Sequence, residues 1–181
     1  MNLFKKLGLS LVLFAAAFCA QAATETVNGI TWNYTVYDGK AVILKGWSLP
    51  EIPTNTVEVI TIPSTLGGYP VVSIGDYAFE GRSSLTSVTI PDSVLRIGAR
   101  AFRNCTSLKS VTLSDKLDVI PREAFEGCIS LTNCVIPHGI SEIGFGAFDG
   151  CRSLQEIVIP KNVKIVSWRA FMNCSKLRKL L

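Results

Sequence analysis

Between residues 78 and 171 of this 181-residue chain the dipeptide Ala-Phe occurs five times, at a constant interval of 23 residues. Leucine, isoleucine and cysteine positions keep the same interval, so whole columns of side chains are repeated. Self-similarity of this kind indicates a solenoid, in which each repeat packs only on its neighbours. The repeated alanines are Ala78, Ala101, Ala124, Ala147 and Ala170.

Each repeat predicts two short strands and a turn. The segment from Leu85 to Ile90 carries the spaced apolar residues of a short strand, which Pro91 ends. A second extended segment follows, and Ala101-Phe102 is expected on a brief helical turn. Two residues after each Phe the chain carries only Gly or Asn, which favours a left-handed residue that closes the turn. These residues are Gly81, Asn104, Gly127, Gly150 and Asn173.

The segment 23–61 lacks the repeat and predicts a different structure. Apolar and polar residues alternate from Ile30 to Val36, Asp38-Gly39 is a hairpin turn signal, and a return strand follows. We expect a β-hairpin cap over residues 23–61 and a repeat solenoid over 62–181, whose first repeat carries a five-residue insertion. The predicted fold class is a β-rich α/β repeat solenoid, right-handed, with five 23-residue leucine-rich repeats, parallel strands and an N-terminal β-hairpin cap.

Residues 1–22 have the pattern of a secretory signal peptide. Lys5 and Lys6 precede an apolar stretch from Leu7 to Phe18, and Ala20-Gln21-Ala22 matches an A-x-A cleavage site. The apolar stretch is shorter than the roughly 20 residues that span a bilayer. We therefore expect export, to the cell surface, the medium or the periplasm.

The repeat pattern resembles a known family. From Ile90 to Leu108 the chain reads I-P-x-x-V-x-x-I-G-x-x-A-F-x-x-C-x-x-L, which is similar to the BspA-like leucine-rich repeat of bacterial surface proteins. Arg82 and Pro121 depart from it, standing where the other repeats have Cys and Gly or Ser. The resemblance implies a secreted or surface-displayed, non-enzymatic module for adhesion or ligand binding, without identifying the ligand. The function we expect is to hold a protein or glycan. The alternative is a structural segment, or shortened relative, of a larger surface protein with no ligand of its own.

Composition argues against several other functions. The chain has one histidine, and its formal charge of +4 falls to +2 without residues 1–22, too little to favour nucleic acid as a partner. We expect no catalytic residue, no cofactor and no metal. Cys134 and His138 lie four residues apart, but Cys134 occupies a strand column expected to face the core. The column Cys105, Cys128, Cys151 and Cys174 has three interpretations, namely buried free thiols, a disulfide or a metal site.

Two surface features suggest a contact site near the C-terminus. Phe145 and Trp168 occupy the column two residues before the repeated Ala, which is expected to face outward, and residues 159–181 carry six cations and no acid. The alternative explanation of the two aromatic residues is local packing at the rim, and that of the cations is a solvated end of the solenoid. If the ligand binds elsewhere, we expect it on the strand face around Lys109, Asn133, Val135, Glu156 and Val158. The candidate ligand contacts are Phe145, Trp168, Arg169, Lys176, Arg178 and Lys179.

The expected partners follow from these features. We expect a protein or glycan ligand, no nucleic acid, and at most a peripheral association with a membrane. The last strand, near Leu177 and Leu180, would present an open edge. Edge-to-edge self-association through the C-terminal repeat is therefore a further expectation.

Overall fold

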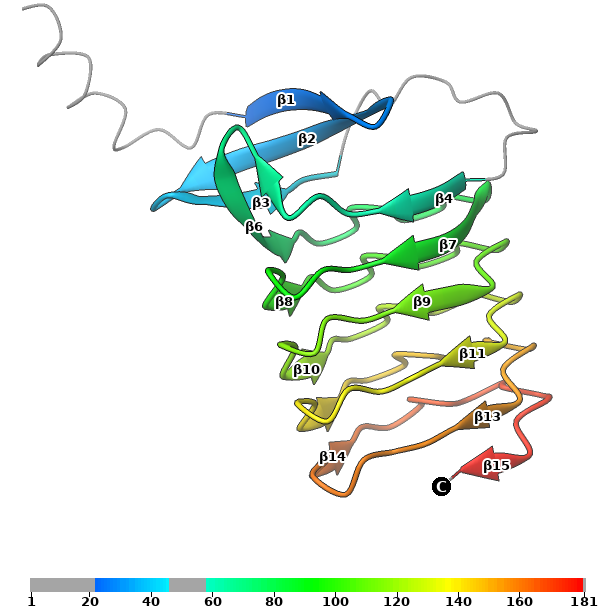
Figure 1. The fold of residues 1–181 in the computed structure, drawn as a ribbon. Helices are drawn as coiled ribbons and strands as arrows, with labels where there is room; N and C mark the ends of the chain where they lie inside the picture. The colour runs from blue at the N-terminus through cyan, green and yellow to red at the C-terminus, as the bar shows by residue number, and fades with distance from the viewer. Residues whose placement is uncertain (1–21, 46–57, 181) are drawn as a thin grey trace, which may run out of the picture.

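Stacked coils of short strands and turns form most of this protein (Figure 1). The computed structural model describes residues 22–45 and 58–180, and it contains no helix within them. The predicted signal peptide falls almost entirely outside these residues. The strands of the cap and first coil are β1 (Ala22–Val27), β2 (Ile30–Tyr37), β3 (Lys40–Ile43), β4 (Glu58–Thr61), β5 (Thr65–Leu66) and β6 (Tyr69–Ile74).

Each later coil contributes two strands, except the last, which contributes β15 alone within the described residues. One of the two lies on the front of the solenoid as drawn in Figure 1 and the other on a second side. The front strands are β7 (Leu85–Thr89), β9 (Ser110–Thr112), β11 (Asn133–Cys134), β13 (Glu156–Ile157) and β15 (Lys179–Leu180). The second strands are β8 (Arg96–Ile97), β10 (Val119–Ile120), β12 (Glu142–Ile143) and β14 (Ile165–Val166).

The front strands pair in parallel, as the sequence predicts. They form two sheets, β4-β7-β9-β11 and β13-β15, with no pairing between β11 and β13 among the described strands. Cys134 pairs with Val111 and lies 2% exposed, which confirms its expected place in an inward strand column.

The second side is also a parallel ladder, and one proline explains its interruption. β6 pairs with β8, and β10, β12 and β14 pair in order, but β8 does not pair with β10 in the described part. In the neighbouring repeats the equivalent backbone amides donate to the preceding coil, from Gly98 to Ile74 O at 2.7 Å and from Gly144 to Ile120 O at 2.8 Å. Directly after β10 the equivalent position is Pro121, which has no N–H to donate to the preceding coil. The bond that would join β10 to β8 is therefore missing.

The turns form the remaining side of each coil and hold the centre of the core. Phe102 donates its backbone N–H to Ala124 O at 2.9 Å, and equivalent bonds recur from turn to turn. The Phe rings stack with centroids 5.0 to 5.4 Å apart. The residues predicted to be left-handed all have positive φ, between 57° and 74°. The expected helical turn is wrong, because each turn closes with isolated bonds from one residue to the third before it.

The N-terminal cap contains the predicted hairpin and one strand more. β2 pairs antiparallel with β3 around Asp38-Gly39, and β1 adds antiparallel to β2. β3 pairs in parallel with β6, so the cap sheet continues into the solenoid, and Trp32 meets Phe79 edge-on with centroids 6.2 Å apart. β4 pairs with β7, so the strand ladder begins before residue 62, inside the segment that the sequence assigned to the cap.

The segment with the predicted five-residue insertion differs from the later coils. It forms a small antiparallel hairpin of β5 and β6, with Gly67-Gly68 at the turn and both glycines at positive φ. This segment therefore lengthens one strand of the second side, while β4 keeps a regular pairing with β7 from Val59 to Thr61.

Candidate functional site

The structure places Phe145 and Trp168 side by side on the turn face. Their ring centroids are 5.9 Å apart and their planes are tilted by 57°. Trp168 is 77% exposed, whereas Phe145 is half-buried. The two residues stand in adjacent coils, each two positions before the repeated Ala, and this 23-residue spacing brings them together.

Two guanidinium groups flank the Phe145 ring. Arg122 Cζ lies 5.5 Å and Arg169 Cζ 5.6 Å from its centroid, within the range of cation–π attraction. Arg169 also holds the buried Asp149 carboxylate, with its Nη2 2.6 Å from Oδ2. We name Arg122, Phe145, Trp168 and Arg169 the aromatic–arginine patch. Sequence analysis missed Arg122, which shares the column of Phe145 and Trp168.

The other predicted cations stand elsewhere. The backbone N–H of Arg178 donates to Gln155 O at 3.0 Å, and Lys179 pairs with Glu156, so both belong to the strand face. Lys176 is exposed in the turn before β15. The six candidate residues therefore divide between the turn face and the strand region rather than forming one surface.

A ladder of ion pairs runs along the turn face beside the patch, and sequence analysis did not identify it. Arg103 contacts Glu80 at 3.6 Å and Glu126 at 3.0 Å, so charges of opposite sign alternate from coil to coil. Glu123 accepts hydrogen bonds from Arg100 and Arg122. The sequence signal was present, since oppositely charged residues stand 23 positions apart.

The environment of Glu123 changes its ionisation. The hydrogen bond from Arg100, aided by Arg122, lowers the pKa of the Glu123 carboxyl from 4.5 to about 2, and burial opposes this shift only in part. The bonds to Glu123 and Tyr77 raise the pKa of Arg100. This pair therefore stays charged at neutral pH and holds neighbouring turns together.

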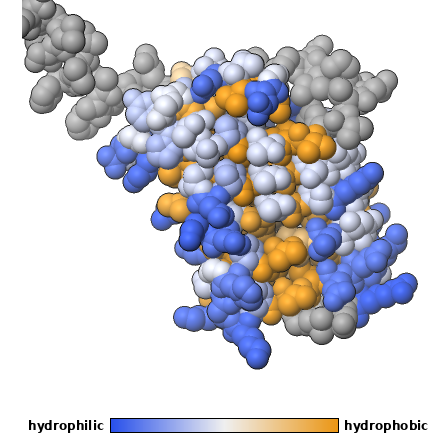
Figure 2. All heavy atoms as spheres, viewed as in Figure 1, coloured by the Kyte–Doolittle hydropathy of each residue, from blue (hydrophilic) through white to orange (hydrophobic). Residues whose placement is uncertain are grey.

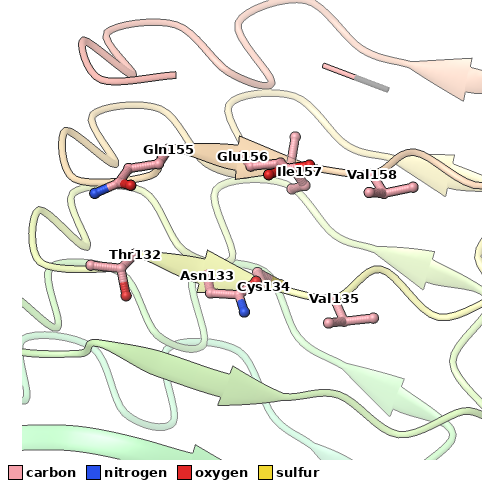
Figure 3. A pocket seen from close by; sticks show the side chains of 8 residues that line it. All are labelled: Thr132, Asn133, Cys134, Val135, Gln155, Glu156, Ile157 and Val158. Carbon is pink, nitrogen blue, oxygen red and sulfur yellow. The ribbon is translucent and has the colours of Figure 1, made fainter. Parts of the chain in front are cut away.

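A shallow groove lies on the strand face between β11 and β13 (Figure 3). It encloses about 410 Å³, and the residues of the two strands line it in matching rows. Val135 and Val158, from its walls, are 72% and 54% exposed. The polar residues that line it are Thr132, Asn133, Gln155 and Glu156.

The cysteine column packs inside the solenoid. Cys105, Cys128 and Cys151 are buried, Cys174 is half-buried, and all five described cysteines are free thiols. Each thiol of the column donates to the carbonyl of the Phe in the preceding coil, as Cys128 Sγ does to Phe102 O at 3.1 Å. Of the three interpretations of this column, buried free thiols describe Cys105, Cys128 and Cys151.

Cys134 is a buried core residue, and it does not form a pair with His138. Burial raises the pKa of the Cys134 thiol to about 12, while His138 is exposed in a turn. Within residues 22–45 and 58–180, no group of three or more His, Cys, Asp or Glu side chains is placed to hold a metal ion. The same residues contain no helix with the length and apolarity needed to cross a membrane.

Comparisons with solved structures identify similar chains in several bacteria. The leucine-rich repeat protein of T. pallidum is 32% identical, with a TM-score of 0.76 over 86% of this chain and 70% of that one. A leucine-rich cell surface protein of Faecalibacterium prausnitzii is 30% identical, with a TM-score of 0.73 over 87% of this chain. A leucine-rich repeat protein of Bacteroides ovatus is 34% identical, with a TM-score of 0.74 over 86% of this chain. This chain spans only 38% and 40% of the latter two.

The sequence comparison defines the family. No curated protein sequence matches the chain significantly. A family profile described as the BspA type leucine rich repeat region matches residues 54–180 in six copies, one more than the five repeats predicted from the Ala-Phe dipeptides. Its first copy includes β4, consistent with the early start of the strand ladder. This chain therefore belongs to the BspA-type leucine-rich repeat family.

Proposed function

We propose that this protein is an exported, non-enzymatic binding module that holds a protein or glycan ligand on the aromatic–arginine patch. The observation that carries the proposal is the 77% exposure of Trp168 beside Phe145 and two guanidinium groups. Tryptophan and arginine dominate the binding energy of protein interfaces, and a large aromatic ring left in water gains most when a partner covers it.

Three further observations support the proposal. The predicted signal peptide supports export, and so does the likeness to the F. prausnitzii cell surface protein. Family membership and the buried Cys134 thiol support a non-enzymatic role. The ion pair of Arg169 with the buried Asp149 also anchors one cation of the patch to the core. A side chain that is already anchored loses less conformational entropy when it binds.

A binding screen with variants tests the proposal. Purified protein is screened against immobilised matrix proteins and glycans, and the affinity for each ligand found is then measured for Trp168→Ala with Phe145→Ala. We expect the affinity to fall about 30-fold or more, as for a hot spot worth roughly 2 kcal/mol. Tyr37→Ala is the matched control, since it removes a 74% exposed aromatic ring from the cap.

Comparing the variants distinguishes a loss of affinity at the patch from a general loss of binding. Charge reversal at Lys176, Arg178 and Lys179 should remove only the part of the affinity that weakens with salt. Unchanged affinity in the double variant, or an equal loss in the Tyr37 control, would contradict a site at the patch. Retention of the protein in the cytoplasm on cell fractionation would contradict export.

A second candidate function is supported by the length of the relatives. Because this chain spans less than half of two similar structures, it also resembles one repeat segment of a larger surface protein. Such a segment would hold no ligand of its own, and the screen would return none.

A further inference from the structure

The outward side of the front strands changes its chemistry partway along the solenoid. One outward position per coil carries threonine in the first three coils, where Thr61 pairs with Thr89 and Thr89 with Thr112. The next two coils carry Val135 and Val158 there, 72% and 54% exposed. Threonine and valine have nearly the same shape, so this change replaces hydroxyls with methyl groups that face water. Nothing in the core benefits from it.

The two valines stand at the groove between β11 and β13. Figure 3 shows Val135 and Val158 in matching places at one end of the two rows, with Thr132 and Gln155 at the other. Figure 2 shows hydrophobic residues gathered on the lower part of this face, with hydrophilic residues on both sides. The groove of about 410 Å³ therefore joins an apolar side to a polar side.

Two cations bracket the groove along the solenoid. Lys109 precedes Thr132 by one coil, and Arg178 follows Gln155 by one coil. Backbone hydrogen bonds of 3.1 Å from Thr132 to Lys109 O and 3.0 Å from Arg178 to Gln155 O hold this register. Both cations are exposed. Three coil steps of about 4.8 Å place them about 14 Å apart, close to the roughly 13 Å between residues i and i+4 of an extended peptide.

We propose that the groove binds an extended segment of a partner protein, running across the strands, with an apolar side chain between two acidic residues. In such a segment residues i, i+2 and i+4 face one side. With the apolar residue over Val135 and Val158, the two acids lie about 10 Å along the strand direction from the row that holds Lys109 and Arg178, a gap that a long cationic side chain and a glutamate side chain span together. The Asn133 side-chain amide donates and accepts, which suits the peptide groups of the segment. The groove has no aromatic ring for a sugar face. It is a second surface, and the proposal does not rest on the aromatic–arginine patch.

Selection from a phage-displayed library of random linear heptapeptides on the purified protein tests this assignment. We expect the enriched peptides to share an apolar residue with an acidic residue two positions to either side. Labelled synthetic copies of these peptides should bind about tenfold more weakly to the double variant Val135→Thr with Val158→Thr. This variant lacks two methyl groups that the bound peptide would cover. The variant repeats the threonines of the earlier coils, so the fold is expected to persist, and its urea midpoint checks this.

A matched double variant removes exposed aliphatic groups elsewhere. Leu95→Thr with Ile165→Thr changes two half-exposed residues of the second side and should leave peptide binding unchanged. Lys109→Glu should weaken the binding of the acidic peptides and should not weaken the binding of peptides in which lysine replaces the acids. The assignment is overturned by a library that returns no such consensus, or by equal losses in the two double variants. Sedimentation showing self-association that Val135→Thr with Val158→Thr abolishes would assign the groove to a second copy instead.

Discussion

Replacing Phe125 by alanine tests how the stacked rings hold the solenoid together. Phe125 is fully buried, and its ring stacks on Phe102 and Phe148 with both centroid distances at 5.4 Å. Removing a buried phenylalanine costs about 3–5 kcal/mol, and a favourable aromatic pair adds roughly 0.5–1.5 kcal/mol beyond buried area. We therefore expect Phe125→Ala to lower the free energy of unfolding by about 4–6 kcal/mol.

Phe171 gives the matched comparison. It occupies the same column but is half-buried, and Phe148 is its stacking partner at 5.4 Å. Because part of the Phe171 side chain is already exposed and it stacks on one ring instead of two, Phe171→Ala should cost less, roughly 2 kcal/mol. Urea unfolding followed by far-ultraviolet circular dichroism measures both values. Phe125→Leu, expected to cost about 1–2 kcal/mol, keeps the test informative if the alanine variant does not fold. Losses that agree within about 0.5 kcal/mol at Phe125 and Phe171 would refute the stacking argument.

Three further predictions concern charge, thiols and assembly. Because the folded state lowers the pKa of Glu123 from 4.5 to about 2, its contribution to stability is complete above about pH 4.5 and is lost toward pH 2. The stability difference between wild type and Glu123→Gln should therefore close over that range in urea titrations. A Glu123 effect that does not change with pH would contradict this. In protein processed after residue 22, thiol labelling should be slow and begin at half-buried Cys174, whose pKa burial raises to about 11, and unfolding without reductant should give five labels. Recovery of one or three labels would instead indicate disulfides. Self-association through the C-terminal repeat predicts concentration-dependent sedimentation that Val166→Lys on β14 reduces, and a monomer at every concentration would contradict it.

Repeat spacing predicted the core of the fold well. Any column that recurs at 23 residues must occupy the same place in each coil, so Cys134 could be assigned to the inward strand column despite its polar sulfur. The Gly or Asn preference correctly identified left-handed residues, because these two residue types tolerate positive φ best. Family resemblance then supported the same architecture.

Other features lacked a sequence signal. Tyr77, Arg100, Glu123 and Arg169 also have positive φ, between 54° and 61°, although side chains with a Cβ disfavour it. Backbone bonds between coils stabilise this conformation, as from Tyr77 N to Ala99 O at 3.0 Å. Tertiary pairing therefore decides a local geometry that propensity argues against.

The cap and the candidate site show a similar limit. β1 was missed because its burial alternates only between exposed and half-buried residues, so it has little of the hydrophobic pattern of a core strand. Adjacency of Phe145 and Trp168 follows from the repeat, but the pairing of Arg169 with Asp149 does not. The change from threonine to valine is visible in the sequence, yet its meaning depends on which strand positions face outward.

Hydrogen exchange with a bound ligand tests most directly whether this solenoid holds a partner on an outward surface while its core stays unchanged. Backbone exchange of the purified protein is measured by mass spectrometry with and without the ligand from the binding screen. Binding at the aromatic–arginine patch predicts slower exchange in peptides covering residues 143–148 and 166–172, with unchanged exchange in the cap at 22–43. Slower exchange confined to the cap, or no change anywhere at saturating ligand, would contradict the account.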